Sequence, residues 1–213
     1  MPNWVYNHFR ISGDADTISK FWEQATKPHA TAVPNPDSPY YSKDGEWEMT
    51  KGGEFSFMNF LAPDDFATYF TGSNWYDWNV NNWGTKWDTD VRDLDTQAES
   101  ITLSFETAWS PPSGVYEAMA QQYPTLDIYV EWEEEQGFGA ELASDGEGGM
   151  GVTKEWDIPS SHADYVDRDR EDSCNCASED DQEYWYDDCP GKIPDEDDGH
   201  LRRIENLAYE QVG

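Results

Sequence analysis

Four segments of the chain alternate between apolar and polar residues with the period of two that is typical of β-strands. They are residues 3–11, 55–61, 101–109 and 126–132. A shorter alternation at residues 138–142 follows Gly137, a residue suited to a tight turn. The pattern therefore predicts four main strands and a hairpin extension after the last of them.

Two further segments carry apolar residues at the spacing of an amphipathic helix. The first stripe consists of Ile18, Phe21, Trp22 and Ala25, and the second of Tyr116, Met119, Ala120 and Tyr123. Asp14 or Asp16 can cap the first helix and Ser113 the second, while Pro28 and Pro124 end them. One helix is thus expected after the first strand and one after the third.

The predicted order of elements is β-α-β-β-α-β, which indicates an α+β fold. Two βαβ units in this order form a ferredoxin-like antiparallel sheet with both helices on one face. We expect this domain to span residues 1–149, with a tryptophan-rich insertion at 62–99. An acidic C-terminal extension, partly irregular, is expected over residues 150–213, because the composition changes after Gly149.

Four tryptophans are concentrated in one segment of the insertion, which we expect to be a loop. They are Trp75, Trp78, Trp83 and Trp87. In one interpretation Trp83 and Trp87 stack on a ligand or partner, Lys86 binds a phosphate or carboxylate, and Asp88 completes the site. In the other the aromatic rings pack against the sheet and Lys86 pairs with Asp88.

The charge of the chain is strongly unbalanced, with 13 basic and 45 acidic residues and a net charge of −32. Such a field repels nucleic acids and anionic membrane surfaces and attracts basic proteins or cations. We therefore expect a basic protein or a cation as partner, and neither nucleic acid nor membrane. Only seven residues are lysine, so a halophilic source is an alternative explanation of the acidity.

Three cysteines lie in the C-terminal extension, at Cys174, Cys176 and Cys189. Together with His162 or His200 they offer enough thiolate and imidazole ligands for zinc. Their spacing matches no common zinc motif, so solvated thiols in an acidic tail are the alternative. Since no signal peptide and no apolar stretch of membrane-spanning length is present in the sequence, we expect a cytoplasmic location in the host cell.

Three separated motifs resemble those of the YubB-type ferredoxin-like family of phage and plasmid proteins. They are Met1-Pro2-Asn3-Trp4-Val5-Tyr6-Asn7, Trp83-Gly84-Thr85-Lys86-Trp87-Asp88 and Thr107-Ala108-Trp109-Ser110-Pro111-Pro112. The resemblance covers about residues 1–143. It implies a ferredoxin-like sheet and an origin on a mobile element, and it supplies no catalytic residue.

No nucleophile elbow, phosphate-binding loop or zinc-protease motif occurs in the sequence. We therefore expect a non-enzyme that binds a basic host protein through its acidic surface, for example by mimicking DNA to inhibit a host defence. One alternative is a binder of nucleotides or other small molecules that uses the tryptophan-rich segment. Another is an accessory or structural virus protein of a halophile.

Overall fold

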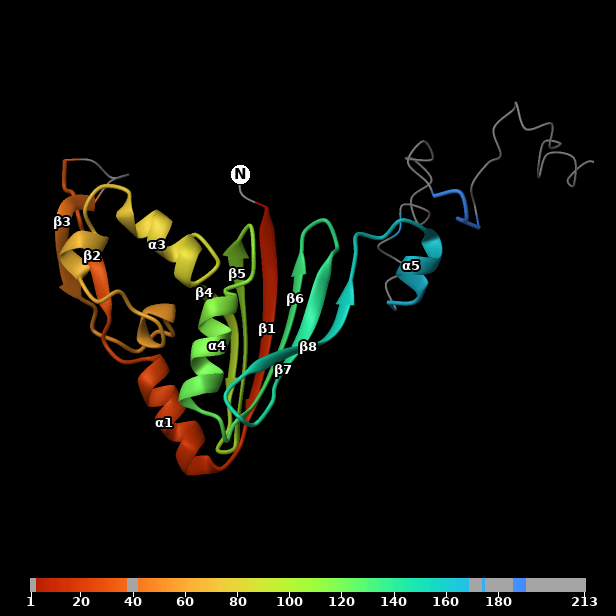
Figure 1. Ribbon diagram of the computed structural model, residues 1–213, viewed down its shortest axis with the longest axis horizontal. Helices are drawn as coiled ribbons and strands as arrows, with labels where there is room; N and C mark the ends of the chain where they lie inside the picture. The colour runs from red at the N-terminus through yellow and green to blue at the C-terminus, as the bar shows by residue number, and fades with distance from the viewer. Residues whose placement is uncertain (1–2, 38–41, 169–173, 175–185, 191–213) are drawn as a thin grey trace, which may run out of the picture. The chain divides into compact units, whose positions relative to one another are not determined.

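The strand β1 (Trp4–Ser12) lies between two antiparallel neighbours at the centre of the main sheet. The computed structural model describes residues 3–37, 42–168, 174 and 186–190 (Figure 1). The chain divides into two compact units, Met1–Asp157 and Ile158–Gly213. The described strands belong to the first unit, and the second contains the short helix α5 (His162–Val166).

Six antiparallel strands form the main sheet in the order β4-β5-β1-β6-β7-β8. Besides β1, they are β4 (Asp90–Thr96), β5 (Ser100–Ala108), β6 (Asp127–Glu134), β7 (Gly139–Ser144) and β8 (Met150–Trp156). The first four strands in this spatial order, with their two crossover helices, make the βαββαβ arrangement. The predicted α+β ferredoxin-like fold is confirmed, as is the hairpin extension, which becomes β7.

Two helices, α1 (Ala15–Ala25) and α4 (Ser113–Gln122), lie on the same side of the sheet (Figure 1). The carboxylate of Asp14 caps α1 by accepting a hydrogen bond of 3.0 Å from the backbone N–H of Thr17. Both helices contribute buried side chains to one apolar core, which also takes in the inner face of the sheet. The opposite face of the sheet is left without these helices.

Alternate residues of β1 enter the core, as the sequence pattern predicts. The buried ones are Val5, Asn7, Phe9 and Ile11. The ring of Phe9 lies 5.2 Å from that of Phe105 on β5 and 5.0 Å from that of Tyr116 on α4, between ring centroids. An aromatic cluster thus joins the central strands to the covering helix.

A buried polar network lies within this apolar core. The side-chain amide of Asn7 donates to the hydroxyl of Thr107 at 3.0 Å and to the carbonyl of Val5 at 2.9 Å. The hydroxyl of Tyr116 donates to Oδ1 of Asn7 at 2.5 Å. Because buried polar groups are costly unless they are paired, these contacts explain why the first and third motifs contain polar residues at inward positions.

The segment between α1 and β4 forms a separate two-stranded sheet and three short helices. These elements are β2 (Ala30–Pro34), β3 (Ser42–Met49), the 3-10 helix η1 (Phe57–Asn59), α2 (Phe66–Tyr69) and α3 (Asn74–Asn82). None of the described helices is long and apolar enough to cross a membrane.

The predicted second strand at residues 55–61 is wrong, since this segment contains η1 instead. Residues 55–60 are all buried, so their alternation does not mark a sheet with one exposed face. The second strand of the βαββαβ arrangement is β4, which lies within the expected insertion at 62–99. It is an edge strand with mostly exposed side chains, and its two apolar residues, Val91 and Leu94, do not alternate because the register shifts between Val91 and Asp93.

The expected tryptophan-rich loop is also partly wrong, because its first half is the helix α3. Gly84 ends this helix with a φ of 92°, a conformation that favours glycine. A Cβ atom at Gly84 would lie 3.0 Å from Oγ of Ser113 and 3.1 Å from the carbonyl oxygen of Pro111. The second motif therefore needs glycine both for its turn and for close contact with the third motif.

The first unit continues beyond residue 149, the boundary expected from composition. The strand β8 pairs with β7 from Ser144↔Met150 to Gly139↔Trp156, with one irregularity in register. Its side chains are mostly exposed, because it is the last strand of the sheet. This exposure gives β8 the polar composition of the acidic extension that follows it.

We predict that Tyr116→Phe lowers the free energy of unfolding by about 1–2 kcal/mol, because Oδ1 of Asn7 loses its donor inside the core. Equilibrium urea unfolding measures the change. The control is Tyr123→Phe, since that hydroxyl donates to Oε1 of Gln24 near the surface, where water can replace it. Equal losses in the two variants would contradict the assigned role of the buried network.

Candidate functional site

A pocket of about 280 Å³ lies in the first unit, beside the tryptophan-rich segment. Its polar wall includes His29, Tyr69, Asn79 and Asp88, and its aromatic wall includes Trp83 and Trp87. Three of the four residues that the sequence indicated as a binding site therefore contribute to one hollow. Of these six residues, His29, Tyr69 and Asn79 were missed, because they lie before β2, on α2 and on α3, outside the second motif.

Asp88 is fixed in the wall of this pocket by three donors. The hydroxyl of Ser56 donates to its carboxylate at 2.5 Å, and the backbone N–H groups of Phe57 and Thr89 donate at 2.8 Å each. Burial disfavours the charged form and raises the pKa of Asp88 above its ordinary value of 3.8, although these hydrogen bonds oppose the rise. The carboxylate thus bridges η1 to the start of β4.

Tyr69 and Asn79 form a second polar pair in the wall. The phenol of Tyr69 donates to Oδ1 of Asn79 at 2.8 Å, and the amide of Asn79 donates to the backbone carbonyl of Lys86 at 2.8 Å. Burial raises the pKa of Tyr69 to about 12, so its hydroxyl remains a donor at neutral pH. This chain of hydrogen bonds connects α2, α3 and the second motif.

Trp83 forms part of the core as well as the pocket wall. Only 1% of its surface is exposed, and its indole N–H donates to the carbonyl of Leu61 at 2.7 Å. Its ring packs edge-on against Phe57 and Trp78, with centroids 5.6 Å and 5.7 Å away. Because it is buried and held by these contacts, Trp83 is a supporting residue of the pocket.

Lys86 lies among aromatic rings. Its Nζ is 4.3 Å from the centroid of Trp87, 5.0 Å from that of Trp109 and 5.8 Å from that of Tyr76. Asp88 is held by the donors described above, so the expected pairing of Lys86 with Asp88 is not what the structure shows. Trp87 and Trp109 remain 39% and 43% exposed, which leaves an aromatic and cationic cluster at the surface.

Trp109 has an unusual backbone conformation for a residue with a side chain. Its φ is 72°, in the left-handed region that costs a non-glycine residue about 1 kcal/mol or more. The backbone N–H of Trp109 donates to the carbonyl of Asn3 at 2.8 Å, and the hydroxyl of Thr85 donates to the carbonyl of Ala108 at 3.0 Å. The three motifs thus meet at this end of the sheet.

The second candidate surface is the face of the main sheet opposite α1 and α4, which we call the acidic face. The register places Tyr6, His8 and Arg10 of β1 on it, and directly paired residues of the neighbouring strands share that side. Its carboxylates are Asp90, Asp93, Asp95, Glu106, Asp127, Glu131, Glu133 and Glu141. The alternating charges in residues 90–95 and 127–133 signal this surface in the sequence.

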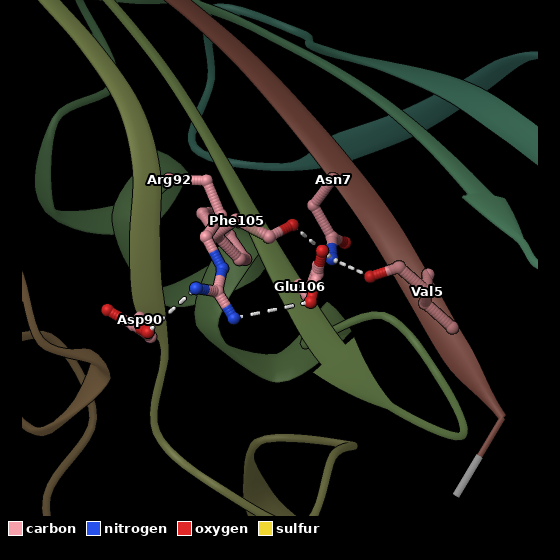
Figure 2. Close-up of polar contacts among 6 residues, drawn as sticks. All are labelled: Val5, Asn7, Asp90, Arg92, Phe105 and Glu106. Carbon is pink, nitrogen blue, oxygen red and sulfur yellow. Dashed lines mark hydrogen bonds and ion pairs between the residues drawn. The ribbon is translucent and has the colours of Figure 1, made fainter.

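A few cations offset this charge locally. Figure 2 shows Arg92 between Asp90 and Glu106, with nitrogen–oxygen distances of 3.3 Å and 3.5 Å. Figure 2 also shows Asn7 on β1, whose side-chain amide donates to the backbone carbonyls of Val5 and Phe105. Exposed ion pairs of this kind stabilise a fold by only about 0–1 kcal/mol. The carboxylates outnumber the cations on this face, so it remains acidic in character.

Next to Arg92 is a second hollow of about 230 Å³. Its lining includes Trp4, Trp87, Asp90, Arg92 and Glu106. The rings of Trp4 and Trp87 lie 6.2 Å apart between centroids. Because Trp87 lines both hollows, it connects the pocket to the edge of the acidic face.

The predicted metal ligands lie in the second unit. Cys174 and Cys189 are both buried, and their sulfur atoms are close to the imidazole of His162. Cys176 and His200 lie outside the described residues. The structure thus brings together three of the residues that the sequence suggested for zinc.

Comparison with known proteins agrees with the fold. A family model described as "Ferredoxin-like domain in Api92-like protein" matches residues 82–172, which is less than half of the chain. The crystal structure of the protein api92 from Yersinia pseudotuberculosis is similar at a TM-score of 0.49 and 10% identity, over 74% of this chain and 100% of that one. No curated protein matches the chain. The family model supports the ferredoxin-like part of the predicted resemblance, while the YubB-type relationship stays a prediction.

We predict that Asp88→Asn changes how stability depends on pH. The raised pKa means that the folded wild type binds a proton more tightly than the unfolded chain. Wild-type stability should therefore fall, relative to the variant, as pH rises from about 3.8 through the folded-state pKa.

The asparagine can keep both backbone hydrogen bonds at Oδ1, so the variant is expected to fold. Unfolding by urea at a series of pH values, with wild type and variant in parallel, gives the difference directly. A difference that does not vary with pH, or that varies in the opposite direction, would contradict a raised pKa.

Proposed function

We propose that this ferredoxin-like protein is a non-enzymatic binding protein whose acidic face engages a basic region of a host protein. The observation that carries the proposal is the placement of eight carboxylates on the sheet face opposite α1 and α4. An antiparallel sheet with one face against the helices leaves the other for solvent or a partner. The charge of that face suits a partner rich in lysine and arginine.

Some of these carboxylates oppose one another across neighbouring strands. Glu131 on β6 lies directly opposite Glu141 on β7, and Asp90 on β4 lies opposite Glu106 on β5. Like charges in such positions destabilise a sheet, and Arg92 and Lys154 offset them only from exposed positions. Cationic side chains of a partner would relieve this repulsion, so binding such a partner would stabilise the sheet.

Aromatic side chains accompany the carboxylates. Tyr6 is 52% exposed near the middle of the face, and Tyr129 lies beside Arg10 with the guanidinium 5.7 Å from the ring centroid. Trp87 and Trp109 are exposed at the end of the sheet where the motifs meet. Tyrosine and tryptophan are enriched among the residues that dominate binding energies, so they give this surface anchors as well as charge.

A more specific version of the proposal is that the partner is a nucleic-acid-binding protein of a host defence system, with the carboxylates in the place of DNA phosphates. The net charge of −32 and the resemblance to phage and plasmid proteins support this version. A DNA-binding protein neutralises phosphates with lysine and arginine side chains, and the same side chains can pair with the carboxylates of the acidic face.

We predict that Glu106→Gln, Glu131→Gln and Glu141→Gln together weaken binding to a basic protein at least about 10-fold, because several charge contacts are lost at once. The matched control replaces Glu23, Glu54 and Glu117 with glutamine. These three are exposed on α1, ahead of η1 and on α4, so the control has the same change in net charge away from the acidic face. The measurement is affinity capture from host lysate, followed by titration of the captured protein against wild type and both variants.

Wild type and control should retain the same basic protein, and rising salt should release it as the Debye length falls from about 10 Å at 0.1 M to about 3 Å at 1 M. Equal loss in both triple variants would show that net charge, rather than this face, is responsible. A chain that captures nothing and folds only in molar salt would instead support an accessory protein of a halophile.

A second candidate function is the binding of a small molecule in the 280 Å³ pocket. Its lining offers the carboxylate of Asp88, the imidazole of His29, the phenol of Tyr69 and the ring of Trp87. This set suits an uncharged or cationic aromatic ligand better than a phosphate, while the ammonium of Lys86 is engaged by aromatic rings.

We predict that such a ligand quenches tryptophan fluorescence in wild type and in Trp156→Phe, and that Trp87→Ala removes the quenching. Trp156 serves as the control because it lies on the edge strand β8 and is not among the residues that line the pocket. Titration with nucleosides and with aromatic amines tests both ligand types. No quenching by any of them, or equal quenching in all three proteins, would remove this candidate.

A further inference from the structure

The described part of the second unit contains a compact cluster of metal-binding side chains. The imidazole of His162 and the sulfur atoms of Cys174 and Cys189 all lie within 4.8 Å of one another. Only 2% of Cys174 and 6% of Cys189 is exposed. Three ligand atoms of the types that zinc prefers thus converge inside the unit, although the residues are up to 27 positions apart in the sequence.

The separation of the two sulfur atoms fits a shared metal ion. Sγ of Cys174 lies 3.6 Å from Sγ of Cys189. Two thiolates at the zinc–sulfur distance of about 2.3 Å and tetrahedral angles are about 3.8 Å apart. A disulfide needs about 2.05 Å between the sulfur atoms, so the two cysteines have the spacing of ligands around an ion.

Hydrogen bonds hold the segments that carry these ligands in place. The carboxylate of Asp188, next to Cys189, accepts from the backbone N–H of His162 at 2.7 Å and of Ala163 at 2.9 Å. These bonds cap the start of α5 and hold the segment that carries Cys189 against the helix that carries His162.

A second contact supports the same arrangement. The hydroxyl of Tyr186 donates to the carbonyl of Pro159 at 2.8 Å, and the backbone N–H of Cys189 donates to the carbonyl of Tyr186 at 3.1 Å. Residues 186–189 are therefore folded as a turn against residues 159–163. These contacts place Cys189 next to His162, as a preorganised site requires.

Among the described residues of the second unit, the buried apolar cluster is too small for an ordinary core. The buried cluster consists of the two cysteines, with Tyr165 and Tyr186 packed against it. Small units of this kind need disulfides or metals for stability. The surrounding sequence also favours a cation, because residues 157–198 contain sixteen acidic and three basic residues.

We propose that His162, Cys174 and Cys189 bind a structural zinc ion that organises the second unit. Three protein ligands leave the fourth tetrahedral position for water or a further side chain. Cys176 follows Cys174 by two positions but lies outside the described residues, and the proposal rests on the other three. Bound zinc would replace a core as the stabilising element of this unit.

The experiment uses the full-length chain without an affinity tag, reduced and stripped of metal. Zinc is titrated in competition with a chromogenic chelator, and Co²⁺ is added separately as a spectroscopic probe. We expect one equivalent of zinc per chain, and with Co²⁺ the intense visible bands of a tetrahedral site together with thiolate-to-cobalt charge transfer.

Loss of a residue that only supports a metal ligand weakens metal affinity by roughly 10–100-fold. The single variants Cys174→Ser, Cys189→Ser and His162→Asn remove a ligand itself, so each should weaken zinc affinity by more than that. The control His8→Asn lies in the first unit on β1 and should bind as wild type does. The Co²⁺ spectrum of the wild type does not depend on whether a variant folds.

Three results would overturn the proposal. The reduced wild type could fail to compete with the chelator for zinc. Its Co²⁺ complex could lack thiolate charge transfer and show the weak bands of an octahedral ion. Peptide mapping of the chain isolated from cells could instead find Cys174 joined to Cys189 as a disulfide.

Discussion

The pairing of β1 with both β5 and β6 is the constraint on which the rest of the first unit depends. Because side chains alternate across a strand, this register sends Val5, Phe9 and Ile11 into the core and Tyr6 and Arg10 to the opposite face. A shift by one residue would bury charge and expose the core. The aromatic contacts behind the sheet and the carboxylates in front of it are therefore two consequences of one pairing.

The three sequence motifs contain residues that stabilise the fold, apart from any role in binding. Asn7 and Thr107 share a buried hydrogen bond, Trp83 is fixed by the carbonyl of Leu61, and Gly84 allows close contact with Ser113. Exposed side chains at the same end of the sheet, such as Trp87, are the ones left to meet a partner. The motifs thus combine residues that build the scaffold with residues that it presents.

Sequence patterns identified the strands and helices that have one buried face, as β1, β5, β6, α1 and α4 show. They failed for β4, whose exposed edge carries carboxylates, and for residues 55–60, whose alternation does not separate a buried face from an exposed one because all six residues are buried. Within the site, Trp83, Trp87 and Asp88 were indicated by one motif. His29 and Tyr69 could not be, because only tertiary packing brings their elements to the same pocket. Likewise, no spacing rule joins His162 to Cys189; the hydrogen bonds of Asp188 do so.

The binding role proposed for the acidic face depends on the register of β1, which sends the carboxylates to the side opposite the helices. Carbodiimide labelling of carboxylates, with and without the basic protein captured from the host, tests it at the level of single residues. Binding should protect Glu106, Glu131 and Glu141 from modification while Glu23 and Glu117, on the helices, react as before. Protection confined to the helical side, with the acidic face still reactive, would contradict the account.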